Sequence, residues 1–361
     1  MKNKNILELC LSDGLGGLEL FAASCYKSFS KHTSCKLVIS PNQKLDNYLE
    51  DEEKYYINRN KIFPIFPAIK LAKFIDKNDI DIIHFHWTRD IITAVLAKLI
   101  SKKKPKLVQS RHMNITRFKN DIYHRWLYKN IDMIHAVTNK LNEDIKKYVP
   151  SEVIPKIEMI YLGTKVPDIN KQKLEQLSKQ YKINDEFIVG IVGRIEEEKG
   201  QYKLIEAINK LKLLNIKAII VGSAMDEEYF ESLRTKVEYY NLSDKIIFAG
   251  FSKDVNEYMQ LFDVNILATS NETFGLVIIE AMANKTTVIT TNKGGPLEII
   301  EDKINGLLFD GSIDDLANKI EQLYKDRNLK LQLSNAGYQT VIKKFNKDIQ
   351  LMELYNAITK I

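Results

Sequence analysis

Two glutamates separated by a seven-residue spacer are the most informative candidates for chemistry in this chain. Glu272 precedes the turn Phe274-Gly275-Leu276, and Glu280 falls within the helix predicted after that turn. Gly275 permits a sharp turn or a close approach of the backbone to a ligand, and a helix starting there directs unpaired N–H groups toward an anion such as phosphate. Because the two carboxylates would lie about 12 Å apart on a helix, they cannot share one proton. We interpret them as contacts to two different parts of one extended ligand.

Basic, glycine and histidine residues at other predicted strand ends could contribute to a ligand site. Arg194 and Lys199 follow a strand and precede a helix, where two cations can clamp a diphosphate; a solvated charged loop is the alternative. Gly16 and Gly17 lie in a glycine-rich loop after the first strand, which favours close approach of a ligand or, alternatively, a plain tight turn. His112 follows another strand and could hydrogen-bond a substrate hydroxyl or offset a developing charge.

Other polar residues are interpreted as structural. His84 and His86 alternate on one strand, but no third metal ligand is evident, so hydrogen-bonded core histidines are favoured over a metal site. Gly294 and Gly295 follow a strand and form either a plain turn or a close approach to a ligand. The three cysteines lack metal-binding spacing and are expected in the core, where cysteine is most often found: Cys10, Cys25 and Cys35. Their odd, sparse count fits a reducing cytoplasm.

The elements that would position these residues alternate between strand and helix along most of the chain. Strands are predicted at 5–11, 36–40, 81–85, 106–110, 133–138, 157–162, 187–193, 217–221, 245–250, 264–268, 287–291 and 306–309. Helices between them include 68–78 and 252–262, the latter with Ser252 as its N-cap. Residues 164–170 interrupt the alternation as a linker.

Two runs of alternation predict an α/β protein with two Rossmann-like, doubly wound parallel-sheet domains facing a ligand-binding cleft. The expected domains are 1–166 and 167–345, followed by a C-terminal helix over 346–361. A length of 361 residues exceeds what one core usually covers.

Charge is distributed unequally between the two halves. Residues 1–166 hold 28 Lys+Arg against 18 Asp+Glu, whereas the remainder holds 25 against 29. The first half therefore attracts an anionic ligand or surface. Apolar and basic residues mix in two stretches, 62–74 and 98–129, that could lie on a bilayer or, alternatively, be core helices with solvated basic faces. No apolar run is long enough to span a membrane.

The motifs, taken in order, resemble those of the large family of retaining glycosyltransferases with two Rossmann-like domains, the GT-B fold, often called family 4. In the second half the matching segments are 192–200, 270–280, 294–298 and 305–309. In the first half they are 16–19, 81–86, the strand ending at His112, and 136–138. The resemblance spans nearly the whole chain, and it implies that the C-terminal helix over 346–361 crosses back to the first domain.

The resemblance implies a role for each residue at a matching position. His112 and Glu272 are the expected catalytic residues, with His112 contacting the donor sugar and stabilising the transition state. Arg194 and Lys199 would bind the diphosphate of the donor, and Glu272 would bind its sugar hydroxyls. Glu280 would bind the ribose. Backbone amides of Phe274, Gly275 and Leu276 and a loop carrying Gly16 and Gly17 would complete the donor site. Family members generally need no metal, so neither a metal site nor a cofactor is expected.

The expected reaction is transfer of a sugar, with retention, from a UDP- or GDP-sugar to a glycan or lipid-linked acceptor. Lipopolysaccharide, O-antigen, capsule or other cell-envelope polysaccharide synthesis is the expected setting, in the cytoplasm or at the inner face of the cell membrane. A nucleotide-sugar 2-epimerase of the same fold is one alternative. A non-enzymatic basic binding protein is another, although no nucleic-acid-binding module is recognised. The sequence does not identify the donor sugar, the nucleotide base, the acceptor or the oligomeric state.

Overall fold

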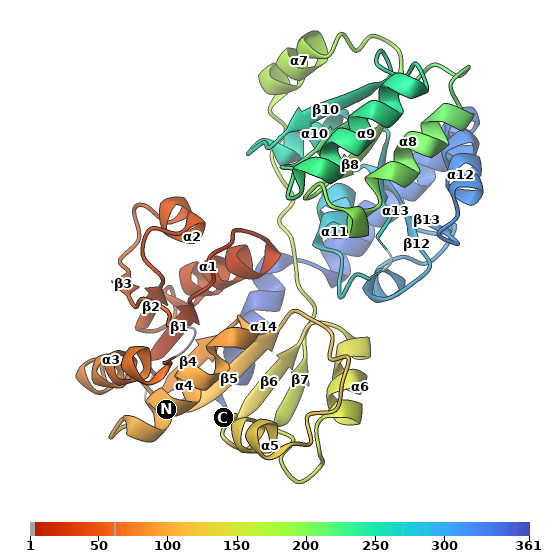
Figure 1. Ribbon diagram of the computed structural model, residues 1–361. Coiled ribbons are helices and arrows are strands. Elements are labelled where there is room, and N and C mark those ends of the chain that lie inside the picture. The colour runs from red at the N-terminus through yellow and green to blue at the C-terminus, as the bar shows by residue number, and fades with distance from the viewer. Residues whose placement is uncertain (1–3, 61–62, 270) are drawn as a thin grey trace. The chain divides into compact units, whose positions relative to one another are not determined.

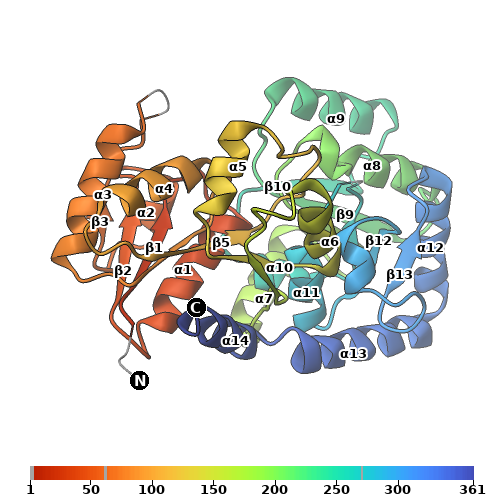
Figure 2. The same cartoon turned by 90° about the horizontal axis from the view of Figure 1, so that it is seen from below.

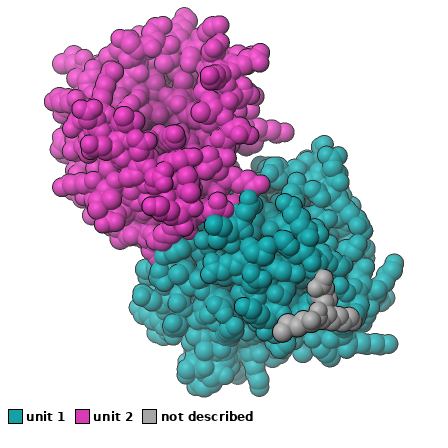
Figure 3. Space-filling model, turned by 180° about the vertical axis from the view of Figure 1, so that it is seen from behind, with its two compact units in different colours: residues 1–162, 348–361 teal, residues 163–347 magenta. Residues whose placement is uncertain are grey.

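The computed structural model describes residues 4–60, 63–269 and 271–361, and the chain forms two compact units (Figure 3). Unit 1 comprises Met1–Leu162 and Asp348–Ile361, and unit 2 comprises Gly163–Lys347. The expected boundaries after residues 166 and 345 lie four and two residues from these. No helix of the described residues is long and apolar enough to cross a bilayer.

Unit 1 is built on a parallel sheet whose strands are ordered β3-β2-β1-β4-β5-β6-β7 (Figure 1). The strands are β1 (Ile6–Cys10), β2 (Cys35–Ile39), β3 (Tyr55–Tyr56), β4 (Ile82–Phe85), β5 (Lys106–Arg111), β6 (Met133–Ala136) and β7 (Lys156–Met159). The helices are α1 (Gly17–Phe29), α2 (Lys44–Tyr48), α3 (Ile65–Lys77), α4 (Ile91–Ile100), α5 (Ile122–Lys129), α6 (Asn139–Tyr148) and α14 (Lys347–Thr359), with a 3-10 turn η1 (Thr88–Asp90).

Helix α14 closes the core of unit 1 although it is the last element in the sequence. It lies beside α1 (Figure 2), and the ring of its Tyr355 lies 5.5 Å from that of Phe29 on α1. Its apolar side chains Leu351, Leu354 and Ile358 are buried in the same cluster as those of α1, β1 and β2. The chain therefore leaves unit 1 and returns to complete it.

The segment that leaves unit 1 and the segment that returns to it lie side by side. Thr164 N–H donates to the Phe345 carbonyl at 2.9 Å, and Lys347 N–H donates to the Thr164 carbonyl at 3.1 Å. A Cβ on Gly163 would stand 2.6 Å from the Lys347 Cα. Only glycine allows the two backbones to approach this closely.

Unit 2 is a second parallel sheet, ordered β10-β9-β8-β11-β12-β13. Its strands are β8 (Phe187–Val192), β9 (Ile216–Val221), β10 (Ile246–Gly250), β11 (Val264–Leu267), β12 (Thr287–Thr291) and β13 (Leu307–Phe309). Its helices are α7 (Lys171–Gln180), α8 (Gln201–Lys210), α9 (Glu227–Tyr239), α10 (Val255–Leu261), α11 (Leu276–Ala283), α12 (Ile313–Lys325) and α13 (Arg327–Lys344), with 3-10 turns η2 (Glu197–Lys199) and η3 (Gly295–Glu298). Successive side chains of β8 point to opposite faces of the sheet, and each face is covered by helices. Val189 packs with α8, α9 and α12, and Ile188 packs with α7 and α10.

Two helix starts differ from those expected from the sequence. Helix α3 begins at Ile65 and includes Pro67 in its first turn, because a missing N–H costs nothing where no intrahelical partner exists. The helix expected from residue 252 begins only at Val255, with Asp254 as N-cap. Ser252 is not the cap because its Oγ accepts a hydrogen bond from Asp254 N–H at 3.0 Å in the preceding turn.

Each sheet contains one place where the strand order reverses. In unit 1 it lies between β1 and β4, and in unit 2 between β8 and β11. At such a switch point the loops leaving neighbouring strands diverge and leave room for a ligand at the carboxyl edge. The loops after these four strands carry most of the candidate residues.

Candidate functional site

Arg194 and Lys199 leave the carboxyl end of β8 at the switch point of unit 2. The Arg194 side chain is 60% exposed and pairs with Glu196 at 2.9 Å. Lys199 Nζ lies 3.1 Å from Glu272 Oε2, and both side chains are about a quarter exposed. The β8 loop and the β11 loop are thus joined by an ion pair whose members are both reachable by a ligand.

Gly200 places Lys199 beside the β11 loop. It adopts a left-handed conformation with φ of 74° as it caps the start of α8, and a Cβ there would stand 2.8 Å from the Ala268 carbonyl. Gln201 fixes the preceding loop because its Nε2 donates to the Arg194 carbonyl at 2.8 Å. This geometry keeps both cations at the strand end.

The glycine pair after β12 supports the backbone around Glu272. Gly295 N–H donates to the Glu272 carbonyl at 2.9 Å, and a Cβ on Gly295 would stand 2.2 Å from the Thr273 carbonyl. Gly294, with φ of 69°, would bring a Cβ within 2.7 Å of the Glu272 carbonyl. The close approach that these glycines allow is therefore to the β11 loop. Ser270, at the start of the predicted motif, lies outside the described residues.

The turn before α11 presents backbone rather than side chains. Phe274 is 3% exposed, and its ring lies 5.9 Å from that of Phe345. Gly275 has a φ of 100° and caps α11, which begins at Leu276. A side chain at position 275 would be strained. Ile278 N–H donates to the Gly275 carbonyl at 2.9 Å, whereas the amides that precede it in the turn have no carbonyl within the helix to bond. The arrangement suits an anion at the helix start.

Glu280 lies in the second turn of α11 and is partly buried. Burial raises the pKa of its carboxyl, while the charge of Lys347 acts in the opposite direction. The carboxyl of Glu280 is therefore protonated more readily than an exposed glutamate, so its charge depends on its immediate surroundings.

In unit 1 the glycine-rich loop is shaped by Glu19. The Glu19 side chain accepts a hydrogen bond from Gly16 N–H at 2.8 Å and another from Ser12 Oγ. Gly16 caps α1, and Gly16 and Gly17 are both exposed. In the sequence, Glu19 was included only as the last residue of the matching segment 16–19, whereas its place three residues after the cap was the available signal for a capping role.

His112 directly follows β5, and its Nε2 is buried without a hydrogen-bond partner among the described residues. Its ring stands edge-on to Phe21 at 5.1 Å and stacks on His86 at 6.0 Å. Burial, then repulsion from His86, His135 and His84, lowers the pKa of His112 well below its ordinary value. His112 is therefore a neutral imidazole that can donate or accept a hydrogen bond.

His84 and His86 are fully buried and hydrogen-bonded to Glu8, as expected for core histidines. Ligand atoms of Glu8, Cys25, His84 and His86 lie within 4.8 Å of one another, and the Glu8–histidine separations of 2.9 and 2.7 Å are those of hydrogen bonds. The cysteines are buried thiols, as predicted for core residues.

A hollow of about 550 Å³ lies away from all of these residues. Lys217 and Lys245, which line it, stand at the amino ends of β9 and β10. It therefore opens at the edge of the unit 2 sheet opposite to the carboxyl edge that carries the candidate residues.

Comparison with known structures agrees with the fold. A glycosyltransferase from Rickettsia africae superposes with a TM-score of 0.89 at 24% identity, covering 100% of both chains. Anabaena Alr3699/HepE, crystallised with UDP and glucose, superposes with a TM-score of 0.88 at 20% identity over 99% of this chain and 100% of that chain. Both parallel-sheet units therefore match the GT-B architecture.

Curated relatives act in sugar transfer. N-acetyl-alpha-D-glucosaminyl L-malate synthase of Bacillus anthracis is 26% identical over 84% of this chain and 81% of its own length. The lipopolysaccharide core biosynthesis glycosyltransferase LpsE of Rhizobium meliloti is 30% identical, but the match spans 45% of this chain and 47% of that protein. The capsular polysaccharide biosynthesis glycosyltransferase CapM of Staphylococcus aureus is 29% identical over 53% of this chain and 51% of its length.

Two family models match in succession and cover both units. The model described as "Glycosyltransferase Family 4" matches residues 16–166, and the model described as "Glycosyl transferases group 1" matches residues 173–340. The motif residues lie within these matches, on the fold shared with the solved structures. The chain belongs to the group 1, family 4 glycosyltransferases.

Proposed function

We propose that the protein transfers a sugar from a UDP- or GDP-sugar to a glycan or lipid-linked acceptor in cell-envelope polysaccharide synthesis. The observation that carries this proposal is the ion pair of Lys199 with Glu272 beside the start of α11. A cation, a carboxylate and free helix amides at one switch point match the diphosphate and the sugar hydroxyls of such a donor.

The donor would exchange partners with the existing ion pairs. Its diphosphate takes Arg194 and Lys199 from Glu196 and Glu272, and Glu272 then accepts hydrogen bonds from the sugar hydroxyls. The amides of Gly275 and Leu276 approach the phosphates, and Glu280 accepts from the ribose. The partial exposure of both pairs supports this exchange, since solvent-accessible ion pairs are weak and easily replaced.

The chemical step proceeds with retention at the anomeric carbon. The bond from that carbon to the diphosphate oxygen breaks, and its electron pair leaves with the nucleoside diphosphate. Arg194, Lys199 and the α11 amides stabilise the growing negative charge. The acceptor hydroxyl bonds to the same face of the oxocarbenium-like sugar, and its proton passes to the departing phosphate. Neutral His112 donates a hydrogen bond to the sugar.

Exposed apolar residues at the carboxyl edge of unit 1 favour a lipid-linked acceptor. Helices α3 and α5 follow strands β3 and β5, so their first turns stand at that edge. Large apolar side chains there are 37–89% exposed: Phe63, Ile65, Phe66, Ile69, Met113, Phe118, Ile122 and Tyr123. With the excess of basic residues in this half, they suit the surface of an anionic membrane. Residue 62 of the predicted stretch lies outside the described residues.

A donor panel tests the reaction class. We expect one UDP- or GDP-sugar to be hydrolysed slowly without acceptor and consumed faster with membrane extract, at a rate that EDTA does not change. Epimerisation of the donor would instead identify the 2-epimerase, and no reaction with any donor would contradict enzymatic activity. An inverted anomer in the product, or a glycosyl adduct trapped on Glu272 or Glu280, would contradict the proposed step.

Liposome flotation tests the membrane contact separately. We expect the protein to float with vesicles containing phosphatidylglycerol at low salt and to dissociate at high salt. The double variant Phe63→Ser/Phe66→Ser should float less, whereas Leu213→Ser, at the 95% exposed Leu213 of unit 2, is the matched control. Equal flotation of all three proteins would contradict the proposed surface.

A further inference from the structure

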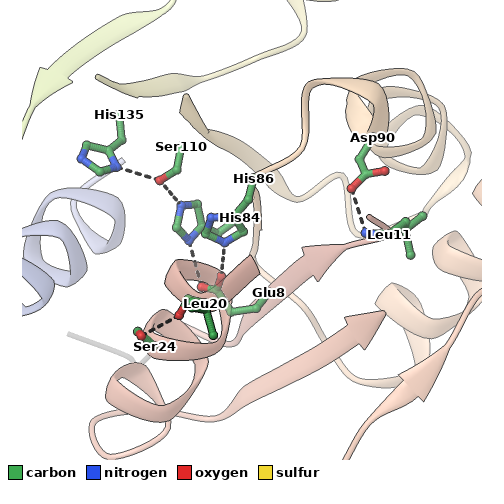
Figure 4. A network of polar contacts seen from close by, with 9 residues as sticks. All are labelled: Glu8, Leu11, Leu20, Ser24, His84, His86, Asp90, Ser110 and His135. Atoms are coloured by element: carbon green, nitrogen blue, oxygen red, sulfur yellow. Dashed lines mark hydrogen bonds and ion pairs between the residues drawn. The ribbon is translucent and has the colours of Figure 1, made fainter. Parts of the chain in front are cut away.

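A line of buried polar side chains crosses four neighbouring strands of unit 1. Each of these side chains is at most 1% exposed, and hydrogen bonds join them into a line that we name the polar ladder (Figure 4). Its members are Glu8 on β1, His84 on β4, Ser110 on β5 and His135 on β6. Glu8 is opposite His84 in the strand register, and Ser110 is opposite His135. Such pairs point to one face of the sheet, so the line is built into the strand register.

The proton positions along the polar ladder follow from its far end. His135 Nε2 lies 2.7 Å from the Ile160 carbonyl, which can only accept, so this nitrogen carries the hydrogen. Burial lowers the pKa of His135 to about 3, so its Nδ1 is unprotonated and accepts from Ser110 Oγ at 2.7 Å. Ser110 Oγ must then accept from His84 Nε2–H, also at 2.7 Å.

At its near end the polar ladder divides at Glu8. His84 Nδ1 and His86 Nε2 approach the two carboxylate oxygens at 2.9 and 2.7 Å. Burial alone would raise the pKa of Glu8, but the charge of His84 and hydrogen bonds from His84 and His86 lower it below its ordinary value. Glu8 is thus a carboxylate that accepts a hydrogen bond from each ring.

His86 is held in one tautomer by this arrangement. Burial, then repulsion from His84, lowers the pKa of His86 to about 4, so the ring is neutral and its hydrogen is on Nε2, facing Glu8. Its Nδ1 is buried without a partner among the described residues. A buried carboxylate beside an unsatisfied nitrogen is a costly way to fill a core, which points to a role other than stability.

The ring of His86 connects the polar ladder to His112. The two rings stack with centroids 6.0 Å apart and planes at 28°. Phe21 of α1 stands edge-on to both, at 5.7 Å from His86 and 5.1 Å from His112. A rotation of His86 would therefore disturb the surface against which His112 rests.

We propose that Glu8 and His86 are positioning residues for sugar transfer: Glu8 fixes the tautomer and orientation of His86, and the His86 ring holds His112 in its reactive position. The proposal rests on the proposed function, in which His112 contacts the donor sugar. Neither residue touches the donor, so their effect should appear in turnover rather than in donor binding. A displacement of about 1 Å at a reacting group can lower the rate about a hundredfold.

Two variants break the contact from opposite sides. Glu8→Leu removes the acceptor of His86, and His86→Leu removes the stacked ring while leaving Glu8 bonded to His84. We expect each to lower kcat by about 10-fold to 100-fold with the KM for donor within about twofold, because the donor-binding residues of unit 2 are untouched. If Glu8→Leu fails to fold, His86→Leu still decides the outcome.

Two further variants separate positioning from stability. Glu8→Gln can donate to His84 Nδ1 and accept from His86 Nε2–H, so it should recover most of the kcat lost in Glu8→Leu. Ser110→Ala breaks the polar ladder away from His86 and should lower the melting temperature by a few degrees while kcat falls less than about threefold. Loss of kcat in Ser110→Ala as large as in Glu8→Leu would reduce Glu8 to a structural role and overturn the proposal.

The ¹⁵N and ¹H shifts of the His112 ring give a readout that does not depend on activity. We expect neutral His112 shifts in the native protein and in Glu8→Gln, and displaced or exchange-broadened shifts in Glu8→Leu and His86→Leu. Unchanged His112 shifts in both leucine variants would overturn positioning. Displaced shifts together with full activity of His112→Ala would instead overturn the proposed role of His112.

Metal analysis of the purified protein gives a separate test. One equivalent of bound transition metal, lost in Glu8→Leu, would assign Glu8 and His86 to a metal site and overturn the proposal.

Discussion

The switch points of the two sheets use polar residues in opposite ways. In unit 1, Glu8, His84 and His86 are fully buried and bonded to one another. In unit 2, Lys199 and Glu272 are about a quarter exposed and form an ion pair at 3.1 Å. Buried polar networks are rigid because every broken bond is costly, whereas exposed ion pairs change partners at little cost. The difference indicates that unit 1 holds a fixed geometry and unit 2 exchanges contacts with a ligand.

Removing a cation from unit 2 should have the largest effect. Lys199→Ala is expected to lower kcat/KM for the donor by about 10²-fold to 10³-fold, as for loss of one group that stabilises a developing negative charge. Steady-state kinetics with the donor found by the panel measures it. Lys210→Ala, which removes an exposed lysine paired with Asp314 in the same unit, is the control and should change kcat/KM little. Equal effects of the two variants would remove Lys199 from the site.

A buried carboxyl should make the stability of unit 1 depend on pH. Burial raises the pKa of Asp90 to about 7, although its Oδ2 accepts from Leu11 N–H at 2.9 Å. Since an unfolded aspartate ionises near pH 4, the contribution of Asp90 is complete below that pH and is lost as the pH rises to 7. Asp90→Asn should therefore gain about 2 kcal/mol of unfolding free energy relative to the native protein between pH 5 and pH 7.

Urea unfolding at several pH values measures this difference. Asp51→Asn, at an exposed aspartate of the same unit, should run parallel to the native protein. If the unfolding free energy of Asp90→Asn ran parallel to that of the native protein across this pH range, Asp90 would be ionised in the folded state. That result would weaken the contrast between a fixed unit 1 and an exchangeable unit 2.

Glu280 should affect donor binding more than turnover. Glu280→Gln is expected to raise the KM for donor about tenfold with kcat nearly unchanged, because it weakens a charge-assisted hydrogen bond to the ribose. Burial raises the pKa of Glu280, so the affinity of the native protein for donor should fall as the pH decreases, and that of the variant should not. A fall in kcat without a change in KM would instead place Glu280 at the reacting carbon.

The smallest expected effect tests whether the ion pairs of unit 2 exchange. Glu196→Ala frees Arg194, to which Glu196 is paired at 2.9 Å. Since exposed pairs contribute little, the dissociation constant for the nucleoside diphosphate should decrease only about twofold to threefold in calorimetry. Weaker binding would mean that Glu196 orients Arg194 rather than competing for it.

Sequence patterns predicted the long strands well and the short elements poorly. Strand β8 is a continuous apolar run and β9 is apolar from Ala218 to Val221, and such runs are recognisable without a structure. The two-residue β3 and the five-residue α2 were missed because such lengths hold little more than one period of the strand or helix pattern, too short for a repeat to be recognised. The start of α3 was misplaced by three residues, because the helix was expected to begin after Pro67 and Pro67 lies in its first turn.

Candidate site residues were found individually, but their pairings were not. Lys199 and Glu272 are 73 residues apart, and they meet only because β8 and β11 are neighbours in the sheet. Glu8, Ser110 and His135 gave no functional signal, since single polar residues in strands usually face solvent. Their position in central strands covered on both faces is what makes them buried, and strand order is not contained in local patterns.

The return of the chain to unit 1 has a consequence for biosynthesis. A ribosome finishes unit 2 before it reaches α14, so Leu351, Leu354 and Ile358 are still missing from the unit 1 core when unit 2 is complete. Unit 1 is synthesised first and yet reaches its full stability last. A chain that stalls before residue 348 would display the apolar surface beside α1, which is the kind of surface that chaperones and proteases of the quality-control system bind.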